Sequence, residues 1–266
     1  LAPDSAAAAH LISEASRLAY ADRALYLADP DFVHVPVKAL LDRNYLRARA
    51  LLIDLRRSMG KANPGRINVR EGRLRSPGRS LDLPSTTHFS IVDADGNAVS
   101  MTSSVENAFG SRLMVRGFML NNQLTDFSFR PTVDGRDVAN KVEPGKRPRS
   151  SMSPALVFGP DGNLRFVLGS PGGSRIIAYV TKTIIGLVDW QLNPQEAVSL
   201  PHHVNRNGTT DLEAETSLIY LKNELEKMGH NIKLRGLVSG LHAVEVTGQR
   251  LKGGADPRRE GIAIGD

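Results

Sequence analysis

The sequence changes character at Thr86. Upstream of it, residues 5–27 and 36–59 carry apolar side chains at helical spacing, whereas residues 66–85 show neither helical nor strand periodicity. Downstream, "TTHFSIVDADGNAVSMTSS" has two β-rich arms around an Asp-Ala-Asp-Gly-Asn turn, which is typical of a β-hairpin. Two helices, an exposed tether and a strand-rich body therefore follow one another along the chain.

The hairpin gathers hydroxyl side chains on one face. With the turn centred on Asp95, cross-strand partners have numbers that sum to about 190, so Thr86 is expected opposite Ser104. The other face is apolar and carries Phe89, Ile91, Val99 and Met101. We expect this apolar face to be the core face, and the hydroxyl face to be either a solvent-exposed edge or a functional site.

The rest of the body mixes strands and helices. Strands are expected in "GFMLNN", "PALVFGPDGNLRFVLGS" and "HAVEVTG", with a second hairpin turn at Asp161-Gly162. Helices are expected in "SRIIAYVTKTIIGLVDW", "NPQEAVSL" and "TSLIYLKNELEKMGH". Near the C-terminus, Asp256-Pro-Arg-Arg predicts a turn with an ion pair. This order indicates an α+β fold with helices packed outside sheets.

Composition excludes several functions. The 266 residues include no cysteine, so disulfides, thiolate metal ligands and a cysteine nucleophile are unavailable. No apolar run approaches membrane-spanning length, so no membrane partner is expected. The net charge of +6 concentrates in residues 43–79, where aromatic side chains are few, which favours a solvated basic segment over a nucleic-acid site. Without an initiator Met or a visible signal peptide, the chain is expected to start within a longer gene product.

A glycine-rich segment, "LGSPGGSR" (168–175), lies between an expected strand and an expected helix. Glycines at such a junction let successive backbone N–H groups point at one spot, assisted by the positive end of the helix. The segment fits neither the Walker pattern nor the dinucleotide fingerprint. It is therefore a candidate site for an anion or a developing oxyanion, with a tight structural turn as the alternative.

These segments together resemble the γ-glutamyltransferase family of self-processing N-terminal-nucleophile hydrolases. The motifs that carry the resemblance are "TTHF", "DADGNAVSMT", "FGS", "LNNQLTDFS", "KRPRSSMSP", "GSPGGSR" and "GGADPRREG". Before them, "AYADRALYLADPDFVHVP" is similar to the closing part of the family's large subunit. The resemblance spans nearly the whole chain and implies an αββα sandwich, incomplete here because the N-terminal part of the large subunit is absent.

The resemblance implies that a precursor cuts itself between Ser85 and Thr86. Residues 1–85 are then the helical end of the large subunit with its processing linker, and residues 86–266 are the small, catalytic subunit. The chemistry is coherent, because an N-terminal threonine carries its own amine, with a reference pKa of about 7.7–8.0. That amine can act as general base for the neighbouring hydroxyl.

Site roles follow from the resemblance, position by position. Thr86 would be the nucleophile, Ser104 would hydrogen-bond it in place of the usual threonine, and Gly172 and Gly173 would donate N–H groups to the oxyanion. Substrate binding would fall to Gln123 and Asp126 for the α-amino group and to Ser150 and Ser151 for the α-carboxylate.

The implied partners are a small-molecule γ-glutamyl or related acyl donor, an amine or water acceptor, and the N-terminal part of the large subunit. No cofactor and no metal is implied, and the adjacent His202 and His203 are expected to point apart rather than to share an ion. The resemblance places the protein in the periplasm or outside the cell.

Two departures from the family pattern leave the substrate open. Glu106 stands where the family usually has Asn; its carboxylate would strengthen ammonium binding and repel the α-carboxylate. The lid segment "FRPTVDGRDVANKVEPG" is shorter than in some members and has no aromatic tip, so a more open site is expected. A cephalosporin- or glutaryl-acylase-like amidohydrolase is therefore the alternative enzyme, and a catalytically silent fragment is the alternative of another class.

Overall fold

The first helical segment packs against the body of the molecule. The computed structural model describes residues 1–67, 75–78, 86–248 and 250–265. Helix α1 (Ala6–Tyr26) begins at Ser5, whose hydroxyl accepts the Ala8 N–H and so caps the helix. The expected second helix is interrupted: α2 (Val37–Leu40) stops, and α3 (Arg43–Ala50) restarts. Asp42 causes the restart, because its carboxylate caps the N–H groups at the head of α3.

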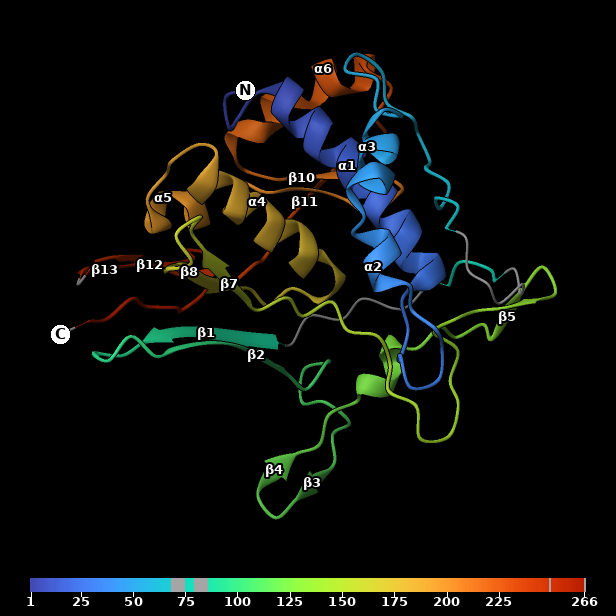
Figure 1. Ribbon diagram of the computed structural model, residues 1–266, viewed down its shortest axis with the longest axis horizontal. Helices are drawn as coiled ribbons and strands as arrows, with labels where there is room; N and C mark the ends of the chain where they lie inside the picture. Colours follow the sequence, from blue (N-terminus) through green and yellow to red (C-terminus); the bar gives the residue numbers. More distant parts are fainter. Residues whose placement is uncertain (68–74, 79–85, 249, 266) are drawn as a thin grey trace.

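A four-stranded antiparallel sheet forms the centre of the body, in the order β13-β12-β8-β7. Its strands are β7 (Ala155–Phe158), β8 (Leu164–Gly169), β12 (His242–Thr247) and β13 (Arg250–Ala255). Helices α4 (Ile176–Val188) and α5 (Pro194–Ser199) cover one face, as Figure 1 shows. The main hydrophobic core lies between them and includes Phe166, Leu168, Tyr179 and Val198. The expected hairpin β7–β8 and the two helices are thus confirmed.

The hairpin of β1 (Thr86–Val92) and β2 (Ala98–Ser104) lies on the other face of this sheet (Figure 1). Its register pairs Thr86 with Ser104, as the turn position predicted. The layers therefore run helix, sheet, sheet, and the αββα expectation is met for the part present in this chain.

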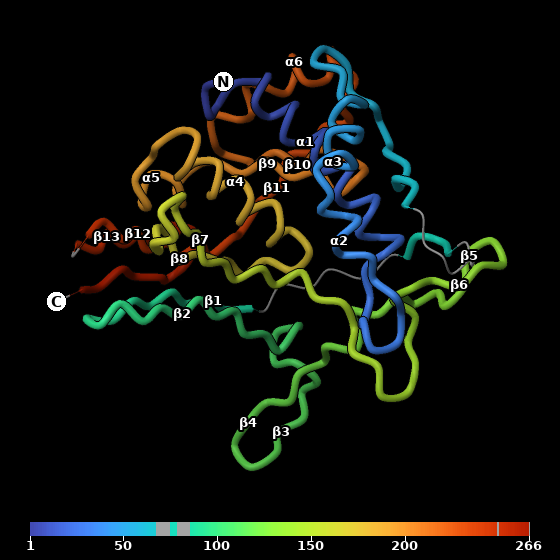
Figure 2. The backbone as a smooth tube through the Cα atoms, viewed as in Figure 1, coloured from blue at the N-terminus to red at the C-terminus, as the bar shows by residue number. Residues whose placement is uncertain are grey.

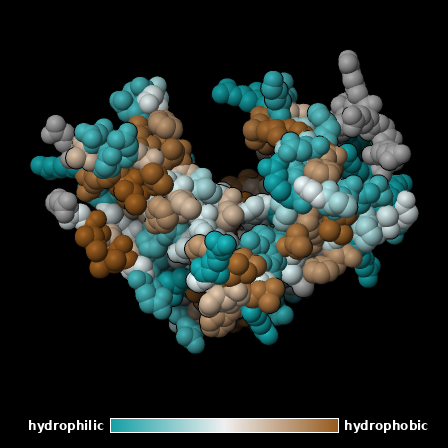
Figure 3. All heavy atoms as spheres, turned by 90° about the horizontal axis from the view of Figure 1, so that it is seen from below, coloured by the Kyte–Doolittle hydropathy of each residue, from teal (hydrophilic) through white to brown (hydrophobic). Residues whose placement is uncertain are grey.

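The prediction that the apolar face of the hairpin is the core face is wrong. The polar face packs inward: His88 is 3% exposed, and the Ser100 hydroxyl donates to the Leu168 carbonyl of β8. The apolar side chains are 39% to 52% exposed, namely Phe89, Ile91, Val99 and Met101. Figure 3, which views the molecule from below, shows groups of hydrophobic side chains on the underside of the molecule. The alternation identified which residues share a face, but not which face another layer covers.

A second, three-stranded sheet joins α1 to the body. Strand β10 (Thr210–Glu213) pairs antiparallel with β9 (His203–Asn205) and parallel with β11 (Ile232–Arg235). Helices α1 and α6 (Lys222–Lys227) pack on it around Leu212, Leu218 and Leu225. These short strands were not predicted from the sequence. The segment before Thr86 and the body after it therefore share a core.

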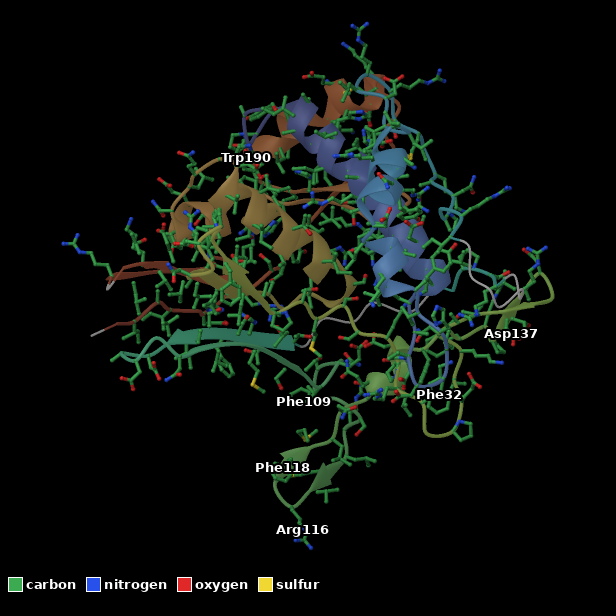
Figure 4. All side chains as sticks on the ribbon, viewed as in Figure 1. Phe32, Phe109, Arg116, Phe118, Asp137 and Trp190 are labelled. Carbon is green, nitrogen blue, oxygen red and sulfur yellow. The ribbon has the colours of Figure 1, made fainter. Side chains whose placement is uncertain are left out.

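Two small hairpins project from the remainder of the chain, as the backbone trace in Figure 2 shows. They are β3 (Met114–Val115) with β4 (Phe118–Met119), and β5 (Thr132–Val133) with β6 (Arg136–Asp137). Figure 4 shows Phe118 and Arg116 on the first of them, well away from the sheets. None of the described helices is both long and apolar enough to cross a membrane.

Candidate active site

Thr86 is the first residue of β1, and its side chain is buried between the layers. It is 7% exposed, and its Oγ1 lies 3.0 Å from Ser104 Oγ on the paired strand. The Glu106 N–H donates to the same Ser104 oxygen at 2.9 Å. Two of the predicted residues are therefore in direct contact. Ser85, the other side of the predicted cleavage bond, lies outside the described residues.

His88 shares the inner face with Thr86 but is not placed to act as its base. Its Nδ1 lies 2.8 Å from Thr102 Oγ1 and its Nε2 lies 3.0 Å from Ser90 Oγ, so hydroxyls occupy both ring nitrogens. Burial, with a smaller effect of His242, lowers the pKa of His88 to about 4. An imidazole with this pKa is a weak base, and both of its nitrogens already contact hydroxyls. We therefore do not assign His88 as the general base for Thr86.

The glycine-rich segment connects β8 to α4 through a short turn, η2 (Gly173–Arg175). Gly172 and Gly173 have φ values of 132° and 60°, which L-residues rarely adopt. At Gly172 a Cβ would also lie 2.6 Å from the Tyr179 ring. Gly172 therefore requires glycine, and Gly173 favours it. The segment ends at the N-terminus of the 13-residue α4, where backbone N–H groups favour negative charge.

An acidic cluster forms near Ser104 from Glu106 and the turn η1 (Gln123–Asp126). The Gln123 amide donates to Asp126 Oδ2 at 3.1 Å and to Glu106 Oε2 at 3.4 Å. The Thr125 hydroxyl donates to Glu106 Oε1 at 3.2 Å, and Glu106 is 4% exposed. Three residues predicted to bind the α-amino group therefore converge, with two carboxylates that favour a cation between them.

The predicted serine pair lies against two arginines that the sequence did not assign to the site. Arg23 of α1 donates from Nη2 to Ser151 Oγ at 2.7 Å and to the Ser150 carbonyl at 3.4 Å. Arg149 donates to the Arg23 carbonyl at 3.0 Å, and burial, then Arg23, lower its pKa to about 9. Their signal in sequence is weak, because the contact joins residues more than 120 positions apart.

The buried amide of Asn140 links this serine segment to the acidic cluster. Its oxygen accepts the Arg149 N–H at 3.0 Å, and its nitrogen donates to the Asp126 carbonyl at 2.7 Å. Arg149 and Asp126 are thus held by a single side chain. A positive region and a negative region lie on either side of Asn140, which suits a ligand that carries both charges.

One cluster remote from these residues has ligand atoms close enough to hold a metal, namely His10, Glu14 and His230. Its atoms are already engaged: His10 Nδ1 lies 2.7 Å from His230 Nε2, and Glu14 forms a buried ion pair with Arg17 at 2.8 Å. A cation there would adjoin the Arg17 guanidinium, so we interpret the cluster as a structural network. His202, by contrast, lies 2.7 Å from Ser239 Oγ, within a separate set of contacts.

Layers of helix, sheet and sheet around a threonine at the head of an inner strand are the arrangement of the N-terminal-nucleophile hydrolases, and the fold belongs to that class. The sequence pattern of the gamma-glutamyltranspeptidase family matches residues 1–266, and the chain belongs to this family.

Individual relatives agree with this assignment. The glutathione hydrolase proenzyme of Pseudomonas aeruginosa is 39% identical over 274 residues, which cover 98% of this chain and 46% of the relative. An acylase ACY 1 proenzyme of Pseudomonas sp. (strain SE83) is 36% identical over 208 residues, 77% of this chain and 34% of the relative. A solved gamma-glutamyltranspeptidase from Pseudomonas nitroreducens has a TM-score of 0.60 at 36% identity, over 68% of this chain and 99% of that chain. This chain therefore spans less than half the length of these two curated relatives.

Proposed function

We propose that the complete protein is a self-processing γ-glutamyltransferase or hydrolase with Thr86 as its nucleophile. The observation that carries the proposal is the buried Thr86 at the head of β1, with its hydroxyl 3.0 Å from that of Ser104. The match to the solved relative from P. nitroreducens covers 68% of this chain and 99% of that chain. Residues 86–266 are also 68% of this chain, and this agreement supports cleavage before Thr86.

Cleavage would create the catalytic base. The Thr86 oxygen attacks the carbonyl carbon of residue 85, its proton passes to the Thr86 nitrogen as the C–N bond breaks, and the resulting ester is hydrolysed by water. The products are a carboxylate on residue 85 and a free α-amine on Thr86. That amine can take the hydroxyl proton in each later turnover, a role for which His88 is unsuited.

Turnover would follow in two acyl transfers. The Thr86 oxygen attacks the γ-carbonyl of the donor, and the leaving amine takes the proton held by the α-amine. Water or an acceptor amine then attacks the acyl-enzyme ester and regenerates the hydroxyl. We assign the stabilisation of the tetrahedral oxyanions to the N–H groups of Gly172 and Gly173, whose positive φ values and place before α4 support this role.

The donor would be held through its α-amino and α-carboxylate groups. We assign the ammonium to the acidic cluster of Glu106, Gln123 and Asp126, and the carboxylate to Ser150 and Ser151. The contact of Arg23 with Ser151 supports the second assignment, because it brings positive charge to that serine. A donor that carries both charges matches this separation.

A glutaryl-acylase-like activity is the second candidate, supported by the similarity to the ACY 1 proenzyme. The test is an assay of the complete protein with γ-glutamyl and glutaryl donors, which differ only in the α-amino group. A higher kcat/KM with the γ-glutamyl donor is expected. A preference for the glutaryl donor would favour the acylase, and turnover of neither would favour a catalytically silent protein.

The nucleophile is tested separately. Thr86→Ala should abolish both cleavage and turnover in the complete protein, because it removes the attacking oxygen. Thr87→Ala is the matched control, because Thr87 is an exposed neighbour on the opposite face of β1. Intact mass and N-terminal sequencing measure the outcome. A small piece that does not begin Thr-Thr-His-Phe, or an uncut chain with full activity, would refute the mechanism.

The remaining partner and the location are also proposals. We infer that the residues by which the curated relatives exceed this chain have a counterpart in the complete protein, and that this part covers the apolar face of β1–β2. We place the protein in the periplasm or outside the cell, by analogy with its family.

A further inference from the structure

Arg259 reaches the nucleophile from the C-terminal end of the chain. Its Nη1 donates a hydrogen bond to the backbone carbonyl of Thr86 at 3.3 Å, across 173 positions of sequence. Figure 2 shows the C-terminal segment running alongside β1 and β2. The sequence predicted only a turn with an ion pair here, so this contact adds a charged group to the site.

The turn that carries Arg259 is fixed by its neighbours. Asp256 is 1% exposed, and its carboxylate accepts from the Leu241 N–H and the Ser239 hydroxyl on one oxygen and from Arg258 on the other. Arg258 also forms a bidentate ion pair with Glu213, at 2.5 and 2.9 Å. The predicted ion pair therefore belongs to Arg258, which is neutralised. Within the described parts of the chain, no carboxylate lies in ion-pair distance of Arg259.

The Arg259 side chain passes between the turn and the glycine-rich segment. A Cβ at Gly240 would lie 2.9 Å from Arg259 Cδ and 2.6 Å from Pro171 Cγ. The side chains of Arg259 and Pro171 therefore both pack against the backbone of Gly240, in the space that a side chain would fill. Pro171 directly precedes Gly172. The buried Arg259 Nε makes no hydrogen bond among the described residues, which leaves Nη1 as the group that connects Arg259 to β1.

The two histidines near Thr86 do not supply a competing cation. On β1, His88 has a pKa of about 4, and on β12 the pKa of His242 is lowered by burial, so both are neutral near pH 7. The Asp256 carboxylate is saturated by its own turn, and the Glu106 carboxylate accepts from Gln123 and Thr125. The guanidinium is thus a positive charge held at the carbonyl of Thr86.

We propose that Arg259 is a positioning residue for the nucleophile, which anchors the Thr86 carbonyl and by its charge favours the neutral, base-competent form of the Thr86 α-amine. The proposal rests on the proposed function, since the amine exists only after cleavage before Thr86. The carbonyl and the nitrogen of one residue are separated by two covalent bonds and the Cα, so a cation at one acts on the other. A positive charge near an amine disfavours its protonated, ammonium form and so lowers its pKa.

The test compares two variants of the complete, cleaved protein. Arg259→Gln keeps a hydrogen-bond donor without the charge, and Arg259→Lys keeps the charge. Arg250→Gln, at an exposed arginine on β13, makes the same change of net charge and is the control. Two quantities are measured against pH: the kcat/KM for a γ-glutamyl donor, and the rate of acetylation of the Thr86 amine, read by mass spectrometry of the N-terminal peptide.

The Gln variant should shift both pH profiles upward by about 0.5 to 1 pH unit, as expected for loss of one cation at this range in a partly exposed site. The Lys and Arg250→Gln variants should follow the wild type. A Gln profile superimposed on the wild type, or a Lys profile equal to that of Gln, would overturn the proposal. If Arg259→Gln is not cleaved, recovery of cleavage by Lys supports it and failure of both overturns it.

The labelling arm separates this proposal from the proposed function. If no free Thr86 amine forms in the wild-type protein, self-processing itself has failed. If the amine forms and titrates identically in all variants, self-processing stands and the role of Arg259 falls.

Discussion

At the scale of single residues, Glu106 carries the most information about the substrate. Its φ of 73° lies in the left-handed region, which Asn tolerates better than Glu, and its side chain is nearly fully buried. Both features disfavour a glutamate unless its charge is used. A strained, buried carboxylate beside Asp126 therefore supports an ammonium site.

We predict that Glu106→Asn lowers the preference of the complete protein for γ-glutamyl over glutaryl donors. The two donors differ in the ammonium group, which loses one of its two carboxylates, while the backbone strain at position 106 is relieved. A loss of about 1 kcal/mol of ammonium binding would reduce the ratio of kcat/KM values roughly fivefold. The ratio is measured with both donors. If it stays constant, Glu106 does not recognise the donor, and the substrate is selected elsewhere.

The pairing of Thr86 with Ser104 was predictable, whereas the inward side of the hairpin was not. A turn fixes the register of its two strands, and register alone placed the two hydroxyls together. Alternation normally marks the polar face as the wet one. Here the polar face is buried because the candidate site lies between two sheets, and that arrangement depends on residues more than 60 positions away, such as Leu168.

At the scale of elements, the contact of β1 with β8 sets the position of Thr86. A Cβ at Gly169 would lie 2.6 Å from His88 Nδ1, and His88 cannot turn away because Ser90 and Thr102 hold its ring. We predict that Gly169→Ala destabilises the protein by about 1–3 kcal/mol through overpacking and lowers activity by displacing β1. Gly236→Ala is the matched control, since nothing lies within 4 Å of its Cβ position. Denaturant unfolding compares the two, and equal stabilities would refute the close packing.

A buried histidine pair connects α1 to the turn after α6. The Asp54 carbonyl can only accept, so His10 Nε2 carries its proton, and His10 Nδ1 then accepts from His230 Nε2 at 2.7 Å. The Thr210 hydroxyl supplies the other His230 nitrogen at 2.9 Å. This network joins the segments on either side of Thr86.

This pair should make stability fall in acid. Burial, then Arg17, lowers the pKa of His230 to about 4, against about 6.5 in the unfolded chain. Between these pH values the unfolded state binds a proton that the folded state does not bind. The contribution of His230 to the free energy of unfolding is therefore fully present above pH 6.5 and decreases toward pH 4. We predict that His230→Gln loses about 2 kcal/mol less than the wild type between pH 6.5 and 4.5. Thermal unfolding across this range measures it, with the exposed His34→Gln as control; parallel curves for all three would contradict the role.

Helix boundaries show where local sequence signals sufficed. The Ser5 cap and the long α1 follow from local patterns, and so do the capped α5 and the hairpin β7–β8. The apolar spacing in residues 36–59 suggested one helix, but Asp42 offers a cap within it and splits it in two. Strands β9, β10 and β11 are too short to show periodicity, and they form because α1 and α6 bury them.

At the scale of the whole molecule, the outer face of β1–β2 is an exposed apolar surface. Isolated exposed apolar residues are ordinary, but here four neighbours on one hairpin are 39% to 52% exposed. The inner face of the same hairpin packs against β8 and β12 of the four-stranded sheet. A layer on the outer face would complete a four-layer sandwich, and the length of the curated relatives beyond this chain leaves room for it.

We predict that Ile91→Lys improves the solution behaviour of residues 1–266 expressed alone but destabilises the complete protein. In residues 1–266 expressed alone, the added charge should reduce self-association and dye binding, because it interrupts an exposed apolar face. In the complete protein it should destabilise by at least about 2 kcal/mol, because Ile91 would be buried there and a lysine would have to be desolvated. Tyr220→Lys is the control, since Tyr220 is 82% exposed on a different surface. Sedimentation of the short chain and thermal unfolding of the complete one give the answer. A complete protein that tolerates Ile91→Lys as well as Tyr220→Lys would mean that this face stays open to solvent in the complete protein.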